Sequence, residues 1–364
     1  MAKKKIILFG NSSWYFFNFR YHLLRDLSKI HNLILVTPDD KYIKNFKFNL
    51  KSISLNYRIN NKINIFEPFI IISKILYILI KFKPDMLINY TVKCNFYGLL
   101  IGKLFNIKII SNITGLGYSH LSQNFILKII NKFYLLLLKN SNLIIVQNKY
   151  DYDFFLKKLR IKSLKIIESS GIEIKKDNLN QNLFNKNKKF LMISRILKEK
   201  GINEYLEAAK SVKEINPKVK FYLYGQGNND TLQAKVQKYH NNKVIIYKNF
   251  SNEIYSIIKK MDCIVLPSYR EGSSKTLLEA ALLRKPILAS DVPGCNNIAI
   301  NNFNAILFKP KNIESLVKAI NKFLKLDTAK LSNMGANGRT HIINKFDVNY
   351  INMETLYQID KVLN

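Results

Sequence analysis

Short apolar runs alternate with longer amphipathic segments along most of the first half of the chain. The runs have the length of strands, and the segments between them have the apolar spacing of helices. The expected strands are residues 6–9, 33–36, 53–55, 86–89, 107–111 and 143–146, and the expected helices are 19–30, 68–82, 97–105 and 124–139. This alternation predicts an α/β fold with a parallel sheet covered by helices on both faces.

A polar stretch at residues 173–189 interrupts the alternation, which then restarts. The second set of expected strands is 189–193, 219–224, 244–247, 263–266 and 286–289, with helices expected at 201–215, 229–239, 254–261, 275–283 and 347–363. Two doubly wound, Rossmann-like halves are therefore expected, with domains at residues 1–170 and 171–346. Ligands of such sheets bind outside the carboxyl ends of the strands, so we expect a deep cleft between the two domains.

The chain is strongly basic, with 58 Lys and Arg against 25 Asp and Glu and a formal net charge of +33. This charge favours anionic partners such as phosphate groups or an anionic membrane surface. A genome-wide bias toward Lys, Ile and Asn codons is the alternative explanation. Zinc-ligand spacing and the aromatic motifs of RNA-binding domains are absent from the sequence, so no nucleic acid partner is expected. The three dispersed cysteines predict a reducing compartment.

The two most apolar stretches, residues 69–82 and 125–138, are each interrupted by lysines. They are shorter than the about 20 apolar residues that a membrane-spanning helix needs. Their mixture of apolar residues and Lys is typical of helices that lie in a membrane interface, and also of ordinary core helices. The start of the chain reads as a first strand and not as a signal peptide. We therefore expect a cytoplasmic protein that is peripheral to the membrane.

The segment from Pro267 to Asp291 holds the most informative motif. Gly272, Ser273 and Ser274 form a turn between an expected strand and an expected helix, whose first N–H groups suit phosphate oxygens. Glu271 lies on the loop, and Glu279 follows eight positions later on the helix. The two carboxylates are thus expected to contact two parts of one elongated ligand, such as the hydroxyl groups of sugars.

This E-x7-E pattern resembles that of the retaining glycosyltransferases of family 4, which have the GT-B fold. The resemblance implies that Glu271 contacts the donor sugar and that Glu279 holds the nucleotide ribose. The other donor-binding residues that it implies are Gly272, Ser273, Ser274, Lys275 and Thr276. It also implies that the last helix, residues 347–364, returns to the N-terminal domain.

Two further segments of the second half are similar to the same family. Arg195 and Lys200 are spaced like an Arg and a Lys that grip the donor diphosphate, and they join Glu271 as the expected catalytic residues. A planar guanidinium and an ammonium both stabilise negative charge on a leaving diphosphate. Gly225 and Gly227 resemble a turn near the nucleotide, with a purely structural turn as the alternative. The sequence contains no Asp-x-Asp motif, so no metal or other cofactor is expected.

The first half resembles transferases that extend undecaprenyl-diphosphate-linked sugars. The resemblance rests on residues 112–118, which include Gly115, Leu116 and Gly117, on residues 89–98 and on residues 18–20. It implies that Arg20 and the Gly115–Gly117 loop bind the acceptor. Many members of the wider family have a His near residues 91–93, which are Thr, Val and Lys here. The role of that His is therefore either lost or taken by Lys93. Tight turns are the alternative role of the glycines.

The resemblance therefore predicts a retaining glycosyltransferase that acts at the inner face of the cytoplasmic membrane. It would move a sugar, an N-acetylhexosamine or a hexose, from a UDP-sugar to a polyprenyl-diphosphate-linked saccharide in surface glycan assembly. Two alternatives remain at this point. A nucleotide-sugar epimerase has the same architecture, and a nucleic-acid-binding protein would account for the charge but not for the paired glutamates.

Overall fold

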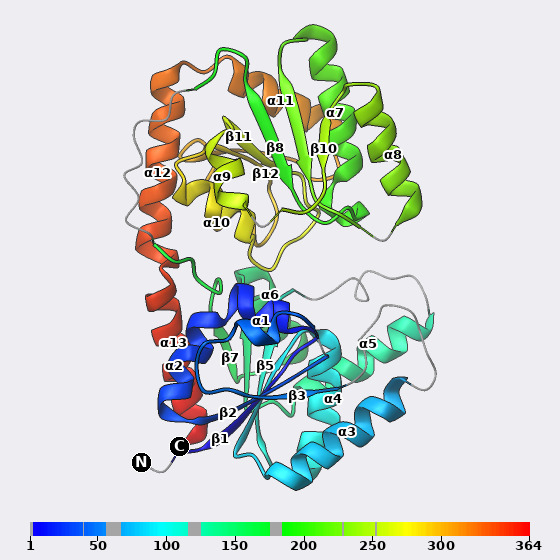
Figure 1. Cartoon of the computed structure of the whole chain (residues 1–364), viewed down its shortest axis with the longest axis vertical. Coiled ribbons are helices and arrows are strands. Elements are labelled where there is room, and N and C mark those ends of the chain that lie inside the picture. Colours follow the sequence, from blue (N-terminus) through cyan, green and yellow to red (C-terminus); the bar gives the residue numbers. More distant parts are fainter. Residues whose placement is uncertain are drawn as a thin grey trace. The chain divides into compact units, whose positions relative to one another are not determined.

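The computed structural model describes residues 3–38, 40–55, 67–115, 125–174, 184–227, 229–251 and 253–364. The chain forms two compact units (Figure 1). Unit 1 consists of Met1–Gly171 and Val348–Asn364, and unit 2 consists of Ile172–Asp347. Each unit has its own parallel sheet, so the predicted α/β class is confirmed. The expected cleft between the domains stays a prediction.

The described strands of unit 1 form a parallel sheet in the order β3-β2-β1-β4-β5-β6-β7. The strands are β1 (Lys5–Phe9), β2 (Asn32–Thr37), β3 (Lys51–Ser54), β4 (Met86–Tyr90), β5 (Lys108–Ile113), β6 (Leu143–Val146) and β7 (Leu164–Ile166). The order reverses direction between β1 and β4. In open sheets of this kind that point is where ligands approach the carboxyl ends of the strands.

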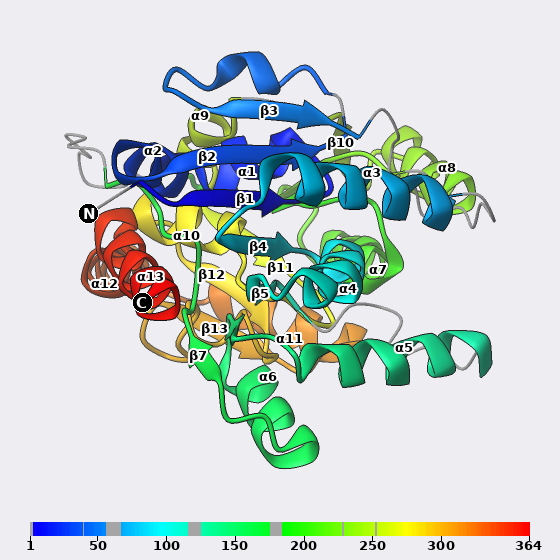
Figure 2. The ribbon, with the colours of Figure 1, turned by 90° about the horizontal axis from the view of Figure 1, so that it is seen from below.

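Alternate residues of the unit 1 strands enter two separate cores. In β1, Ile6 and Leu8 pack with α1, α2 and α13, whereas Ile7 and Phe9 pack on the side of α3, α4 and α5 (Figure 2). The helices are α1 (Ser13–Phe19), α2 (Tyr21–Ile30), α3 (Glu67–Phe82), α4 (Val92–Gly102), α5 (Phe125–Leu138), the short α6 (Lys149–Asp153) and α13 (Val348–Leu363). Because both faces of the sheet are covered, its strands are apolar almost throughout.

Unit 2 repeats the plan with the strand order β10-β9-β8-β11-β12-β13 among its described residues. The strands are β8 (Lys189–Ile193), β9 (Lys220–Tyr224), β10 (Ile246–Lys248), β11 (Cys263–Leu266), β12 (Ile287–Ser290) and β13 (Ala305–Phe308). The helices α7 (Ile202–Ile215), α8 (Asp230–Asn241) and α11 (Ile313–Leu324) contribute to one core. The other core takes its residues from α9 (Ile254–Lys259), α10 (Lys275–Leu282) and the end of α12 (Thr328–Phe346).

Several elements differ from the sequence-based expectation. The helix expected at 19–30 begins at Tyr21 as α2. The helix α1 before it was not predicted, and Arg20 leaves the helical conformation between the two. The helix expected at 97–105 begins earlier, at Val92. The elements α6, β7, β13, α11 and α12 were not predicted. The sequence of α12 has the composition of a loop, but its Gly335 lies against the turn that follows α10, where a Cβ would be 2.0 Å from the carbonyl oxygen of Arg284.

The three cysteines are buried and unpaired, and burial raises the pKa of Cys94 to about 12. In the part of the chain that the structure describes, no helix has both the length and the apolar character needed to cross a bilayer.

The variant Phe190→Ala tests the core on which β8 packs. The ring of Phe190 is fully buried, stacks on Phe221 and meets Phe323 edge-on. Replacing Phe190 with Ala should lower the free energy of unfolding by about 3–5 kcal/mol, because it removes apolar burial and leaves a cavity. Chemical denaturation measures the change. The control Ile215→Ala, at an exposed side chain, should change stability little, and a similar loss in both variants would contradict the assignment of this core.

Candidate functional site

The loop between β11 and α10 carries the first of the paired carboxylates. It leads from Pro267 to Ser274, whose Oγ accepts a hydrogen bond from the backbone N–H of Leu277 and so caps α10. The start of α10 faces this loop. The partial positive charge at the start of a helix favours an anionic group there.

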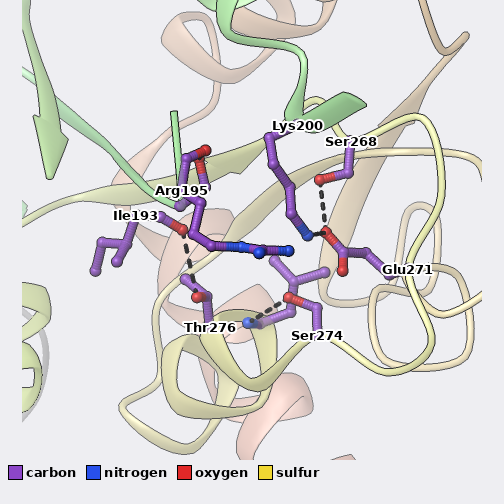
Figure 3. A network of polar contacts seen from close by, with 9 residues as sticks. Ile193, Arg195, Lys200, Ser268, Glu271, Ser274 and Thr276 are labelled. Atoms are coloured by element: carbon purple, nitrogen blue, oxygen red, sulfur yellow. Dashed lines mark hydrogen bonds and ion pairs between the residues drawn. The ribbon is translucent and has the colours of Figure 1, made fainter. Parts of the chain in front are cut away.

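Glu271 accepts hydrogen bonds from two side chains (Figure 3). Lys200 Nζ lies 2.6 Å from its Oε1, and Ser268 Oγ lies 2.7 Å from the same oxygen. The side chains of Lys200 and Glu271 are only 18% and 13% exposed. An ion pair that is sheltered from water in this way is screened less than one on the surface. Two of the residues expected to be catalytic are therefore in direct contact, although they are 71 positions apart in the sequence.

Gly201 makes this contact possible. It follows the 3₁₀ turn η5 (Lys198–Lys200) in the left-handed conformation, with φ +74°. A Cβ at Gly201 would lie 2.1 Å from the carbonyl oxygen of Pro267, so a larger residue does not fit without a shift of the backbone. Tyr269 N also donates a hydrogen bond to Glu199 O at 2.8 Å. These contacts hold the segment after β8 against the loop after β11.

Arg195 adds a second cation at the same place. It follows β8 and is exposed. In Figure 3 its guanidinium lies between Lys200 and Ser274, over the start of α10. Thr276 Oγ1 donates to Ile193 O at 3.4 Å, which links the first turn of α10 to the end of β8. Two cationic side chains and a helix start thus meet at the carboxyl ends of β8 and β11, an arrangement suited to a diphosphate.

The turn that contains Gly225 and Gly227 packs on the segment that holds Arg195. Ser194 N donates to Tyr224 O and Ile196 N donates to Gln226 O, at 3.1 and 3.0 Å. A Cβ at Gly225 would be 1.8 Å from Ser194 O, and one at Gly227 would be 2.3 Å from Ile196 O. Close backbone approach therefore requires both glycines. A contact between this turn and a nucleotide stays a prediction.

Glu279 lies in the middle of α10 and is buried. Burial raises the pKa of its carboxyl to about 7, although Lys275 Nζ, 3.9 Å away, favours the charged form. Burial also lowers the pKa of Lys275. A buried carboxylate with one distant cation retains free acceptor capacity, which is what hydroxyl groups of a ribose require.

Sequence reasoning missed the turn at Pro293-Gly294. Glu271 N donates to Pro293 O at 3.3 Å, and Ser274 N donates to Gly294 O at 3.2 Å. Gly294 has φ +78°, and a Cβ there would lie 2.4 Å from Glu271 O. The turn after β12 therefore supports the loop that carries Glu271. The Pro-Gly pair at 293–294, four positions after the end of an expected strand, was the available signal.

In unit 1 the structure buries Arg20. Its guanidinium carbon lies 5.3 Å from the centre of the Tyr90 ring, and the neighbouring Tyr15 and Tyr90 raise its pKa despite burial. Lys93 is half-buried in the first turn of α4. Gly115 has φ +126°, a conformation that favours glycine. Leu116 and Gly117 lie outside the described residues, and the acceptor roles of all five residues stay predictions.

Three buried asparagines gather at the carboxyl ends of β4 and β5. Asn95 Nδ2 donates to Asn112 O at 3.0 Å. Both amide atoms of Asn89, Asn95 Oδ1 and Asn112 Nδ2 have no hydrogen-bond partner among the described residues. Each buried unpaired polar atom costs about 1–3 kcal/mol. Unit 1 thus has several buried polar groups at the carboxyl ends of its central strands, where ligands of such sheets bind.

Within the described residues, no three His, Cys, Asp or Glu side chains gather as metal ligands would. The expectation of a metal-independent enzyme stays a prediction.

Comparison with known proteins decides the class of this site. Residues 174–341, which contain Arg195, Lys200 and both glutamates, match the family model "Glycosyl transferases group 1". A relative from Campylobacter jejuni, an N,N'-diacetylbacillosaminyl-diphospho-undecaprenol α-1,3-N-acetylgalactosaminyltransferase, is 27% identical over 95% of this chain and 96% of its own. The chain is a glycosyltransferase. This class favours a transferase over the alternative of an epimerase, and the expectation of no nucleic acid partner stays a prediction.

Other relatives agree with this class. The UDP-Gal:α-D-GlcNAc-diphosphoundecaprenol α-1,3-galactosyltransferase of Escherichia coli is 24% identical over 74% of this chain and 73% of its own. The crystal structure of Anabaena HepE with UDP and glucose covers 98% of the enzyme and 99% of its own chain, with a TM-score of 0.79 and 16% identity. Likeness to this and other solved structures confirms the predicted GT-B fold.

The buried carboxyl of Glu279 makes stability depend on pH. Its folded pKa of about 7 lies above the ordinary value of 4.5, so between these values the folded state binds more protons and stability falls as pH rises. Glu279→Gln removes this cost and should stabilise the enzyme at pH 8 relative to pH 5, by about 2 kcal/mol. Thermal unfolding at the two pH values measures it. The exposed control Glu214→Gln should show no such difference, and equal effects of Glu279→Gln at both pH values would refute the shift.

Gly294→Ala tests the support of the Glu271 loop. The added methyl group meets the carbonyl oxygen of Glu271 in a backbone conformation that alanine disfavours. For the UDP-sugar donor that is proposed below, we expect the affinity for UDP to fall at least about tenfold, roughly 1.4 kcal/mol, in calorimetry on protein that is still folded by circular dichroism. The control Gly338→Ala, where a Cβ would make ordinary contacts at 3.4 Å, should bind normally. Normal binding by Gly294→Ala would show that the turn does not support the site.

Proposed function

We propose that the enzyme is a retaining transferase of family 4 that moves a sugar from a UDP-sugar to a polyprenyl-diphosphate-linked saccharide in surface polysaccharide assembly. The observation that carries the proposal is the meeting of Lys200, Glu271 and Arg195 at the start of α10. It brings together a carboxylate for sugar hydroxyl groups and two cations for a diphosphate.

The donor would lie at the carboxyl ends of β8 and β11. Arg195 and Lys200 would bind its diphosphate together with the first N–H groups of α10, supplied by Lys275 and Thr276 after the Gly272–Ser274 turn. Lys200 is paired with Glu271 in this structure, so its ammonium would be shared between the carboxylate and the incoming phosphate. The same cations would stabilise the negative charge that develops on the leaving UDP.

The two glutamates would fix the rest of the donor. Glu271, on the loop beside Lys200, would accept hydrogen bonds from the sugar. Glu279, buried on α10, would accept them from the ribose hydroxyl groups once it is ionised. Because its pKa is raised to about 7, ribose binding should strengthen as pH rises through neutrality.

We infer a front-face displacement for the chemical step. The acceptor hydroxyl oxygen forms a bond to the anomeric carbon while the bond from that carbon to the diphosphate breaks, and the hydroxyl proton passes to an oxygen of the leaving UDP. Both partners are on the same face of the sugar, so the configuration is retained. This step places the required charge stabilisation on Arg195 and Lys200 and uses no metal.

The names of the relatives support the two substrates. HepE was crystallised with UDP and with UDP-glucose. The Campylobacter and Escherichia relatives are named for diphospho-undecaprenol acceptors, and a Staphylococcus aureus relative, 26% identical over 52% of the chain, is named for capsular polysaccharide biosynthesis. An N-acetylhexosamine or a hexose is the proposed sugar.

The acceptor would bind to unit 1. Arg20, Lys93 and the Gly115–Gly117 loop are the proposed residues for its diphosphate. Because a polyprenyl chain stays in the bilayer, the enzyme would work at the inner face of the cytoplasmic membrane as a peripheral protein. Its net charge of +33 would attract it to anionic lipid.

A transfer assay tests the proposal. Purified enzyme is incubated in EDTA with a panel of UDP- and GDP-sugars and a short-chain polyprenyl-diphosphate-saccharide, and the products are separated by chromatography. We expect transfer from one UDP-sugar with retained configuration by NMR. Lys200→Ala and Glu271→Ala should each lower kcat/KM at least about 100-fold, because each removes an interaction with the reacting groups.

The exposed variants Lys198→Ala and Glu214→Ala are the matched controls and should retain activity. Transfer that requires a divalent metal would overturn the metal-independent step. Full activity in both site variants would show that the Lys200–Glu271 pair is not the reaction centre.

A further inference from the structure

The outer face of α3 is apolar. Ile71, Ile75 and Ile78 point into the core of unit 1, as the spacing of a helix requires. On the opposite side Phe69, Tyr77 and Ile80 are each more than half exposed. A surface helix of a globular protein normally presents polar residues on this side. The helix α3 therefore has two apolar faces, and the described residues cover one of them.

The helix α5 repeats this arrangement. Tyr134, Leu137 and Leu138 are buried, whereas Phe125, Ile129 and Leu136 are each more than half exposed. The exposed positions recur at the spacing of one helical face. Two helices of unit 1 thus leave large apolar side chains outside the core.

These two helices belong to one layer. Both pack against α4, on the same side of the unit 1 sheet (Figures 1 and 2). The turn η2 (Lys103–Phe105) follows α4 and exposes Leu104, at 77%. The α3–α5 face is therefore defined here by its outward apolar residues: Phe69, Tyr77, Ile80, Leu104, Phe125, Ile129 and Leu136.

The charges in this layer are nearly all positive. Residues 67–82, 92–105 and 125–138 contain six lysines and one acidic residue, Glu67. Four of the lysines are exposed: Lys81, Lys103, Lys128 and Lys132. Their long side chains can reach outward past the apolar residues while their aliphatic parts stay among them.

We propose that the α3–α5 face docks the enzyme on an anionic lipid bilayer. This inference rests on the proposed function, in which the acceptor is lipid-linked. Apolar side chains flanked by Lys are what a helix needs to lie in the interface, with the apolar residues about 5–10 Å deep and the cations at the headgroups. Large apolar side chains that are exposed on neighbouring elements, and not scattered singly, mark an interaction site.

Charge complementarity selects the bilayer over a second copy of this chain. Two copies joined through this face would bring two sets of four exposed lysines together, which Coulomb repulsion opposes. An anionic leaflet compensates the same charges. Docking would also hold unit 1 close to the polyprenyl diphosphate, which raises the local concentration of acceptor.

Vesicle binding tests the proposal. Co-sedimentation is measured with vesicles of equal parts phosphatidylglycerol and phosphatidylcholine, and with pure phosphatidylcholine. We expect binding to the anionic vesicles that weakens with salt. Two triple variants remove the apolar side chains of one helix each, and each should bind the anionic vesicles at least about tenfold more weakly. The α3 variant carries Phe69→Ser, Tyr77→Ser and Ile80→Ser, and the α5 variant carries Phe125→Ser, Ile129→Ser and Leu136→Ser. Lys128→Gln with Lys132→Gln should reduce the preference for anionic lipid.

The matched control lies on α13 of the same unit. Tyr350, Met353 and Tyr357 are exposed to a similar degree, so the triple serine variant at these positions removes the same kind of surface and should bind vesicles normally. Equal losses in the control and the test variants would overturn the proposal, as would equal binding to both kinds of vesicle.

A soluble acceptor separates this inference from the proposed function. With a water-soluble short-chain acceptor and no vesicles, the face variants should transfer sugar at the wild-type rate. Wild-type transfer without vesicle binding refutes the docking face alone, and vesicle binding without transfer to any polyprenyl acceptor refutes the proposed function alone. A dimer in analytical ultracentrifugation that the face variants abolish would assign the face to a second copy instead.

Discussion

The ion pair between Lys200 and Glu271 depends on how closely three backbone segments of unit 2 approach one another. Lys200 reaches Glu271 because Gly201 lets the chain after β8 pass the end of β11, where a Cβ would clash with the carbonyl of Pro267. Gly294 brings the turn after β12 against Glu271 from another side. Glycine is needed at both places because each has a positive φ and a backbone oxygen where a side chain would be. The site is therefore held mainly by backbone packing, and the charged side chains add to a frame that is already fixed.

The two glutamates of the motif have different surroundings, which fits different tasks. Glu271 is paired with a cation and a hydroxyl group, so it is already in a polar environment before a ligand arrives. Glu279 is buried with Lys275 at a longer distance, and its raised pKa reflects a desolvation cost that is not fully compensated. Unit 1 carries a comparable cost in its buried asparagine cluster. Both units thus hold poorly compensated polar groups near the carboxyl ends of their strands, where ligands of α/β proteins bind.

The proposed reaction and the surface of unit 1 both suit an enzyme that works at a membrane. The match to the group 1 family model and the likeness to named transferases show a glycosyltransferase, and the solved structures show its GT-B fold. The proposed acceptor is a saccharide linked through a diphosphate to a polyprenyl chain. An enzyme that uses it works at the interface between water and the bilayer. The α3–α5 face combines exposed apolar side chains with lysines, and it belongs to the unit proposed to bind the acceptor. An accumulation of Lys from codon bias would explain the net charge, but it does not explain why large apolar residues occupy the outer side of two neighbouring helices.

The sequence by itself determined the alternation of strands and helices, the parallel sheets and the position of Glu271 and Glu279 on a strand–turn–helix. These features depend on local periodicity and on turn residues, which are readable within a few positions. The sequence-based prediction missed α12. Its glycines are typical of a loop, but in the structure they allow close packing of the helix against its neighbours. Only the tertiary structure decided that Lys200 contacts Glu271, that Gly294 supports their loop, that Arg20 is buried beside Tyr90, and which side of α3 and α5 stays exposed. Each of these features depends on how segments that are far apart in the sequence pack against one another. That packing sets the distances between side chains and the burial of each side chain, and no local sequence pattern records it.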